Sequence, residues 1–123
     1  CGYQTSILSK IFSSVTTIER IMPLHNRAKN LLDNLGYNNI KFIHDDGFKG
    51  YQQNAPYDAI IMTASPSKIP QELINQLKPS GRMILPLKIK GSQKLYRIKN
   101  TKNGLLKKEV DDVLFVPMLK GVS

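Results

Sequence analysis

The sequence lacks several features by which a class of protein is often recognised. Tryptophan is absent, cysteine occurs once, at Cys1, and two histidines lie far apart. A single cysteine excludes an internal disulfide framework, and the histidine spacing matches no zinc-binding pattern. No apolar run approaches the roughly 20 residues that span a bilayer, and the first residues have no signal-peptide pattern. We therefore expect a cytoplasmic protein without a membrane segment or a metal site.

Size and composition predict one globular domain over residues 1–123. The chain is 41% hydrophobic and 22% charged, which is typical of a soluble protein with a core. The net charge of +9 would also suit a polyanion, but the lysines are scattered without aromatic side chains to stack on bases. We therefore favour a solvated basic surface over a nucleic-acid-binding face.

The spacing of apolar residues predicts alternating helices and strands. After Gly2, apolar side chains recur at helical spacing, and the run Ala59–Met62 is typical of a strand covered on both faces. In order, we predict a helix from residue 2, a strand at 14–19, a helix from residue 23 that stops at Gly36, a strand at 40–44, a strand at 59–62, a helix from about residue 70, a turn at 78–81 and a buried strand at 82–87.

This order of elements, with short connections, predicts a doubly wound, Rossmann-like α/β sheet. The last part of the sequence differs, because residues 94–100, 105–110 and 113–117 are predicted to be antiparallel strands. Asn103-Gly104 is the signal of a hairpin turn between the first two.

Ligands of doubly wound folds bind beyond the carboxyl ends of the strands, so the residues after each strand are candidates. Gly2, Tyr3 and Thr5 open the first helix, whose free N–H groups and hydroxyl suit a carboxylate or a phosphate. An ordinary helix start explains them equally well. Glu19 ends the next strand, where nucleotide-binding folds place an acid that accepts both hydroxyls of a ribose. The alternative is a plain surface carboxylate.

Two later strand ends carry further candidates. Asp46 is suited to accept a hydrogen bond from an exocyclic amine, and Gly47 lets a flat ring approach, although Asp-Gly is also an ordinary turn. Thr63, Ala64 and Ser65 follow the apolar run and would line the reacting end of a pocket, with a polar loop as the alternative.

Catalytic side chains are harder to assign. The sequence contains no P-loop, nucleophile elbow or paired catalytic carboxylates. His25 lies among polar neighbours and is expected on the surface, whereas His44 ends a strand near two acidic residues. A near-neutral pKa alone makes neither histidine catalytic.

The candidate stretches also occur together in one known family. GYQT, IER, DDGFKGY, APYDAIIMTAS, IPQELINQLKPSGRMILP and FVP resemble the protein-L-isoaspartate O-methyltransferases over nearly the whole chain. The resemblance implies S-adenosyl-L-methionine as cofactor. It also implies methylation of the α-carboxyl of L-isoaspartyl residues in damaged proteins, the first step of their repair.

The resemblance implies a role for each cofactor residue. Gly2 would close the glycine loop beside the methionine part, Glu19 would hold the ribose hydroxyls, and Asp46 with Gly47 would contact the adenine. Methyl transfer from a sulfonium to a carboxylate moves no proton, so the site positions the reactants and needs no general base. The catalytic residues therefore stay unassigned.

The sequence departs from the family pattern in two ways. Asp45 stands where the family usually has glycine, which adds a carboxylate near the adenine position. The family's N-terminal segment, with a substrate-contacting serine–glutamine–proline motif and the first strand, does not precede Cys1. In a sheet ordered 3-2-1-4-5 that strand is central, so we expect the strands at 14–19 and 40–44 to pair apart from the rest.

The leading interpretation is therefore an incomplete methyltransferase domain, inactive by itself, whose exposed strand edges favour self-association. Its partners would be isoaspartyl-containing proteins or peptides, with no nucleic acid and no membrane. A non-catalytic binding module or a degenerate gene product is the second interpretation. A basic nucleic-acid-binding protein, which depends only on charge, is the third.

Overall fold

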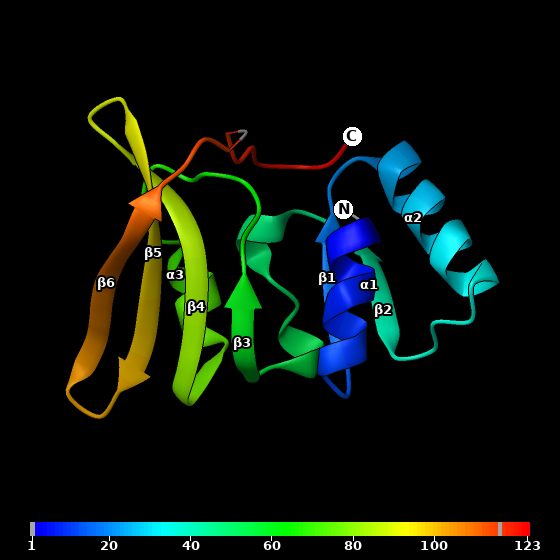
Figure 1. Ribbon diagram of the computed structural model, residues 1–123, viewed down its shortest axis with the longest axis horizontal. Helices are drawn as coiled ribbons and strands as arrows, with labels where there is room; N and C mark the ends of the chain where they lie inside the picture. Colours follow the sequence, from blue (N-terminus) through cyan, green and yellow to red (C-terminus); the bar gives the residue numbers. More distant parts are fainter. Residues whose placement is uncertain (1, 116) are drawn as a thin grey trace. The chain divides into compact units, whose positions relative to one another are not determined.

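The structure is a computed structural model that describes residues 2–115 and 117–123, so Cys1 and Val116 lie outside it. It is an α/β protein (Figure 1). The elements in chain order are α1 (Gly2–Ile11), β1 (Val15–Glu19), α2 (Met22–Asn34), β2 (Ile40–His44), the 3₁₀ helices η1 (Gly47–Lys49) and η2 (Gln52–Asn54), β3 (Tyr57–Ile61), α3 (Gln71–Asn75), β4 (Leu77–Ile89), β5 (Ser92–Thr101) and β6 (Gly104–Asp112).

Contacts within the chain divide it into two compact units. The first contains the described residues up to Tyr51 together with Lys120–Ser123, and the second contains Gln52–Leu119. The strands form a two-stranded sheet of β1 and β2 and a four-stranded sheet ordered β3-β4-β5-β6. The prediction that the first two strands pair apart from the others is confirmed, whereas the expectation of one domain over residues 1–123 stays a prediction.

The first unit is built on two parallel strands. β1 and β2 pair in register from Val15 opposite Ile40 to Glu19 opposite His44, so the side chains that end the two strands are neighbours. α1 lies beside α2 at Gly2, where a Cβ built on this glycine would lie 3.4 Å from the Cβ of Ala28, an ordinary contact distance. The predicted strands at 14–19 and 40–44 and both helices are confirmed.

Helix α2 ends as its sequence predicts. Gly36 has a φ of +84°, a conformation in which glycine carries no Cβ penalty. Its N–H donates to the carbonyl of Asp33, and the N–H of Tyr37 donates to the carbonyl of Leu32. These two bonds form a Schellman motif, which satisfies carbonyl groups that the helix end leaves free.

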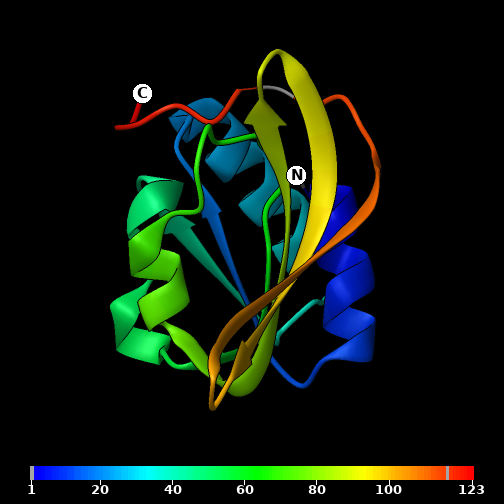
Figure 2. The ribbon, with the colours of Figure 1, turned by 90° about the vertical axis from the view of Figure 1, so that its left-hand side faces the viewer.

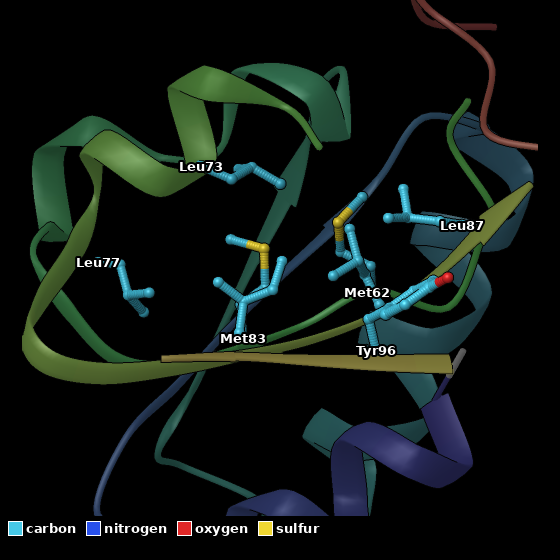
Figure 3. Packing of buried hydrophobic residues seen from close by; sticks show 8 residues of the cluster. Met62, Leu73, Leu77, Met83, Leu87 and Tyr96 are labelled. Atoms are coloured by element: carbon cyan, nitrogen blue, oxygen red, sulfur yellow. The ribbon is translucent and has the colours of Figure 1, made fainter. Parts of the chain in front are cut away.

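The second unit packs its core on one face of the four-stranded sheet. Alternate side chains of β4, including Met83 and Leu85, have no exposed surface, and Ile98 of β5 is equally buried. Figure 3 shows Met83 pointing from β4 toward Leu73 of α3. The cluster consists of Met62, Leu73, Leu77, Met83, Leu85, Leu87, Tyr96 and Ile98. The period-2 pattern of β4 places its members of this set, Met83, Leu85 and Leu87, on a single face.

Three expectations about the second unit are wrong. β3 is not covered on both faces, because Ile61 is 39% exposed and Ala59 is exposed as well, while α3 packs only on the face that carries Met83. Residues 78–81 belong to β4 instead of forming a separate turn, although Ser80 has a φ of +64°. In the stretch 113–117, which includes the undescribed Val116, the described residues form no strand, only an isolated parallel bridge from Pro117 to Ser65.

The hairpin expectation, in contrast, is confirmed. β5 and β6 are antiparallel and meet at Thr101 opposite Gly104, so the turn consists of Lys102 and Asn103. The predicted helix start near Pro70 is confirmed too, since Pro70 directly precedes α3. Among the described residues, no helix has the length and apolar character needed to cross a membrane.

Candidate cofactor-binding site

The carboxyl ends of β1 and β2 place Glu19 and His44 in adjacent register positions. Glu19 is half-buried, and its Oε1 accepts the backbone N–H of Ile21 at 2.9 Å. No hydrogen bond joins its Oε2 to a described residue. The carboxylate is therefore held in one orientation with an oxygen left to accept a ligand's hydroxyl groups.

Asp46 is held more tightly than an ordinary turn residue. Its side chain is buried, Oδ1 accepts the N–H of Phe48 at 2.9 Å, and Oδ2 accepts the N–H of Gly121 at 2.9 Å. The first bond caps the 3₁₀ helix that Gly47 begins. Each carboxylate oxygen has a further lone pair, so the predicted contact with an exocyclic amine would add to bonds that are already formed.

Residues 120–123, which we call the C-terminal segment, cross the loop that follows β1. The N–H of Ser123 donates to the carbonyl of Arg20 at 2.7 Å, and the N–H of Met22 donates to the carbonyl of Ser123 at 2.8 Å. The guanidinium of Arg20 adds a bond from Nε to the carbonyl of Gly121 at 3.1 Å. This segment therefore belongs to the same edge of the sheet as Glu19 and Asp46.

Sequence reasoning missed both Arg20 and the C-terminal segment. Arg20 lies next to Glu19 in the IER stretch, and only the acid was assigned a role there, because nucleotide-binding folds place an acid at this strand end. The bonds of the segment are mostly made by backbone groups, and a backbone group leaves no pattern in the sequence.

Asp45 adds a second charge at this edge. Its Oδ1 accepts the backbone N–H of Asp46 at 2.7 Å and lies 3.3 Å from Nζ of Lys49. The hydrogen bond from the Asp46 N–H, together with that from Lys49, lowers the pKa of Asp45 below its ordinary value of 3.8. This carboxylate, which departs from the family pattern, is therefore ionised at neutral pH. The ammonium group of Lys49 compensates part of its charge.

The residues that open α1 have mixed surroundings. Thr5 is buried, and its hydroxyl donates to Oγ1 of Thr17 in β1 at 3.4 Å, so it joins the helix to the sheet. Tyr3 is 77% exposed. Gly2 lies against Ala28 of α2, but a Cβ would fit there at an ordinary 3.4 Å, so the predicted approach of a ligand stays the reason for a glycine at this position.

Thr63, Ala64 and Ser65 lie in the second unit, whereas the predicted cofactor residues lie in the first. Ser65 is buried, and its hydroxyl donates to the carbonyl of Pro86 at 3.4 Å. Its carbonyl accepts the N–H of Met118 at 3.0 Å. Ser65 therefore joins the loop after β3 to β4 and to the segment that contains Met118, while Thr63 is exposed.

Both histidine rings contact other residues of the first unit. The expectation of a surface His25 is wrong, because its ring is half-buried, 6.4 Å from the ring of Phe42 and edge-on to it, and 5.8 Å from the ring of His44. Nε2 of His44 lies 3.0 Å from the carbonyl of Arg20 and 3.2 Å from that of Ser123. Because carbonyl oxygens only accept, this nitrogen carries the proton and helps to hold the C-terminal segment.

Potential metal ligands do not form a group in the part of the chain that the structure describes. The described residues contain no group of three or more histidine, cysteine, aspartate or glutamate side chains that would hold a metal ion. An open hollow in the first unit is lined by Lys10, Leu35, Gly36 and Tyr37. These residues precede β1 and β2, so the hollow lies at the amino ends of the strands, at the edge opposite to Glu19.

Comparisons with known proteins agree with the resemblance in the sequence. The family model described as protein-L-isoaspartate(D-aspartate) O-methyltransferase matches residues 1–123. A protein-L-isoaspartate O-methyltransferase of Pseudomonas paraeruginosa is 40% identical over 120 residues, covering 98% of this chain and 57% of the relative. One from Nitrosomonas eutropha is 43% identical over 123 residues, covering 98% of this chain and 54% of the relative. The chain thus spans about half the length of these relatives.

Solved structures give the same result. A Plasmodium falciparum protein described as a protein-L-isoaspartate O-methyltransferase, in complex with S-adenosyl-L-homocysteine, matches with a TM-score of 0.76 and 30% identity, covering 88% of this chain and 53% of that one. A second structure, described as a protein-L-isoaspartate O-methyltransferase, matches with a TM-score of 0.82 and 26% identity, covering 89% of this chain and 35% of that one. The fold, with a carboxylate at the end of a parallel strand, is that of the Rossmann-like methyltransferases. Within that class, the chain belongs to the protein-L-isoaspartate(D-aspartate) O-methyltransferase family.

Proposed function

We propose that this chain forms the nucleoside-binding part of an S-adenosyl-L-methionine-dependent protein-L-isoaspartate O-methyltransferase. The observation that carries the proposal is Glu19, a half-buried carboxylate at the end of a parallel strand with one oxygen fixed by Ile21 and the other without a partner among the described residues. The match of the family model to the full 123 residues supports it. So does the related structure with bound S-adenosyl-L-homocysteine.

The residues present fit such a cofactor. Oε2 of Glu19 would accept the ribose hydroxyls, and the remaining lone pairs of Asp46 would accept the adenine amine, with Gly47 as the predicted point of approach for the ring. Gly2, with Tyr3 and Thr5, would face the methionine part at the start of α1, where helix N–H groups favour its carboxylate. The fit is strongest at Glu19, because both oxygens of Asp46 already accept backbone N–H groups.

The substrate of the proposed reaction is the α-carboxylate of an L-isoaspartyl residue in a damaged protein or peptide. When bound, S-adenosyl-L-methionine supplies a methyl group on a sulfonium, which passes to a carboxylate oxygen as the methyl–sulfur bond breaks, with no proton transferred. The protein's contribution is to orient the two reactants and exclude water, and misplacement by about 1 Å can cost on the order of 100-fold in rate. We assign no catalytic residue.

Two measurements test the proposal. Calorimetry with S-adenosyl-L-homocysteine should detect binding to the 123-residue chain, and absence of binding would contradict the assignment of the site. Transfer of a radiolabelled methyl group to an isoaspartyl peptide should occur with a form that is extended at its N-terminus to the length of the relatives. We expect the 123-residue chain to be inactive and to self-associate through its strand edges, which sedimentation would detect. If the extended form is also inactive, the result would favour the second interpretation, in which the protein is a degenerate gene product without catalytic activity.

A further inference from the structure

The face of the four-stranded sheet opposite the core, which we call the outer face, carries two rows of side chains in register across the strands. Residues that are paired in neighbouring strands lie on the same face. The first row is Ala59, Arg82, Lys99 and Leu106, and the second is Ile61, Ile84, Arg97 and Lys108. Both rows alternate with the buried residues Met83 and Ile98, so they point away from the core. Figure 2 shows α3 on the other side of this sheet.

Both rows combine exposed aliphatic side chains with cations. Ile61 is 39%, Ile84 37% and Leu106 62% exposed. In the first row Arg82 is directly opposite Lys99, and in the second Arg97 is directly opposite Lys108. Like charges that are directly opposite in a sheet destabilise it. The outer face therefore holds two repulsive pairs beside apolar surface that no described element of the second unit covers.

The cations of the outer face differ from those on the core side of the same strands. Lys94 pairs with Glu109 at 2.9 Å, and Nζ of Lys107 lies 4.3 Å from the centre of the Tyr96 ring. In contrast, no ion pair or hydrogen bond joins the side chains of Arg82, Arg97, Lys99 or Lys108 to any residue that the structure describes. Within the described part of the sheet, these four cations of the outer face therefore lack the partners that Lys94 and Lys107 have on the core side.

We propose that the outer face binds an acidic amphipathic segment of a partner polypeptide. Its carboxylates would lie between the opposed cations, and its apolar side chains would cover Ile61, Ile84 and Leu106. The residue composition of the outer face favours an acidic peptide over the other candidate ligands. A single-stranded nucleic acid usually stacks its bases on aromatic side chains, and neither row contains one. Two copies of the chain would bring cations against cations. This proposal is independent of methyl transfer.

The test uses a labelled helical peptide of about 18 residues, or five turns, with leucine on one face and glutamate on the other. Fluorescence anisotropy with the 123-residue chain should detect binding that weakens as salt is added. Arg97→Gln/Lys99→Gln, which removes one cation from each row, should weaken binding by about tenfold, because an exposed ion pair contributes up to about a factor of five. Lys68→Gln/Lys102→Gln removes the same charge from exposed positions elsewhere in the second unit and should leave the affinity nearly unchanged.

Folding of the variants is checked independently. Because Arg97→Gln/Lys99→Gln relieves both repulsive pairs, its midpoint of thermal unfolding should equal or exceed that of the parent chain. Leu106→Ser, which keeps every cation, should also weaken peptide binding by removing apolar contact. A peptide with lysine in place of glutamate should not bind.

Several results would overturn the proposal. Equal losses in the two double variants would mean that binding depends only on net charge. Tighter binding of a single-stranded oligonucleotide than of the peptide, with the same dependence on Arg97 and Lys99, would make the face a nucleic-acid site. Peptide binding to the 123-residue chain but not to an N-terminally extended form would place the occupant in the same polypeptide. Failure of the chain to bind the peptide at low salt would exclude the partner altogether.

Discussion

The carboxylate of Asp46 accepts the backbone N–H of Gly121 at 2.9 Å, across 75 residues of sequence. The same carboxylate caps η1 through Phe48. One side chain therefore fixes both the loop after β2 and the C-terminal segment. This double role makes the predicted adenine contact and the stability of the first unit depend on the same residue.

Asp46→Ala should destabilise the chain by about 1–3 kcal/mol, because the N–H groups of Phe48 and Gly121 lose their acceptor. Urea unfolding measures the change in the free energy of unfolding, and amide hydrogen exchange should become faster at Gly121. Asp58→Ala is the control, since Asp58 is highly exposed and pairs only across the surface with Lys78; its effect should stay within about 0.5 kcal/mol. If Asp46→Ala leaves the affinity for S-adenosyl-L-homocysteine unchanged, its role is structural only.

Glu19→Gln should weaken the binding of S-adenosyl-L-homocysteine by about 1.5–3 kcal/mol, because a charged acceptor of the ribose hydroxyls becomes neutral. The amide oxygen can still accept the N–H of Ile21, so stability should change little. Titration calorimetry measures the affinity, with Asp33→Asn as the matched control on the outside of α2. An unchanged affinity in Glu19→Gln would remove Glu19 from the site.

Asp45 should contribute to stability in a pH-dependent way. Since its pKa is lowered in the folded chain, its contribution is present above its ordinary pKa of 3.8 and is lost as the pH falls through the lower folded value. Asp45→Asn should therefore be less stable than the parent chain at pH 7, with the difference shrinking at acidic pH. Lys49→Gln should reproduce part of the loss of stability at pH 7. A stability difference between Asp45→Asn and the parent chain that stays constant across pH would contradict an origin in the ionised carboxylate.

Gly81→Ala should destabilise the second unit by about 1–3 kcal/mol through overpacking. A Cβ built on Gly81 lies 2.7 Å from the carbonyl oxygen of Lys78 and 2.9 Å from the side chain of Leu77. Gly2→Ala is the control, because its Cβ meets its nearest neighbour at an ordinary 3.4 Å. Thermal unfolding should separate the two variants, and equal stability would mean that β4 shifts at little cost.

Local sequence patterns were sufficient for the helices and strands of the first unit. The strand at 40–44 and the helix ended by Gly36 were predicted because β-branched residues, apolar spacing and a glycine stop act over a few neighbours. Glu19 and Asp46 were found by the rule that ligands bind at the carboxyl ends of strands. The structure places both in the first unit, while their contacts with a cofactor stay predictions.

Features that depend on distant residues were beyond local reasoning. The apolar run of β3 predicts burial, but whether its second face is covered depends on which elements pack there, and Ile61 remains partly exposed. The role of Arg20 depends on carbonyl groups of the C-terminal segment, which any residue type would provide. His25 was placed on the surface from its polar neighbours, although its ring turns toward Phe42.

The bond between Arg20 and Gly121 spans 101 residues, and this distance has a consequence for the order of folding. The turn of β5 and β6 closes a short loop, and hairpins form within about 1–10 μs. Closing a long loop costs more entropy and slows folding. During synthesis, the second unit can therefore complete its hairpins while the edge that carries Glu19 and Asp46 still waits for Gly121 and Ser123. The edge with the proposed cofactor residues is then completed after the hairpins of the second unit.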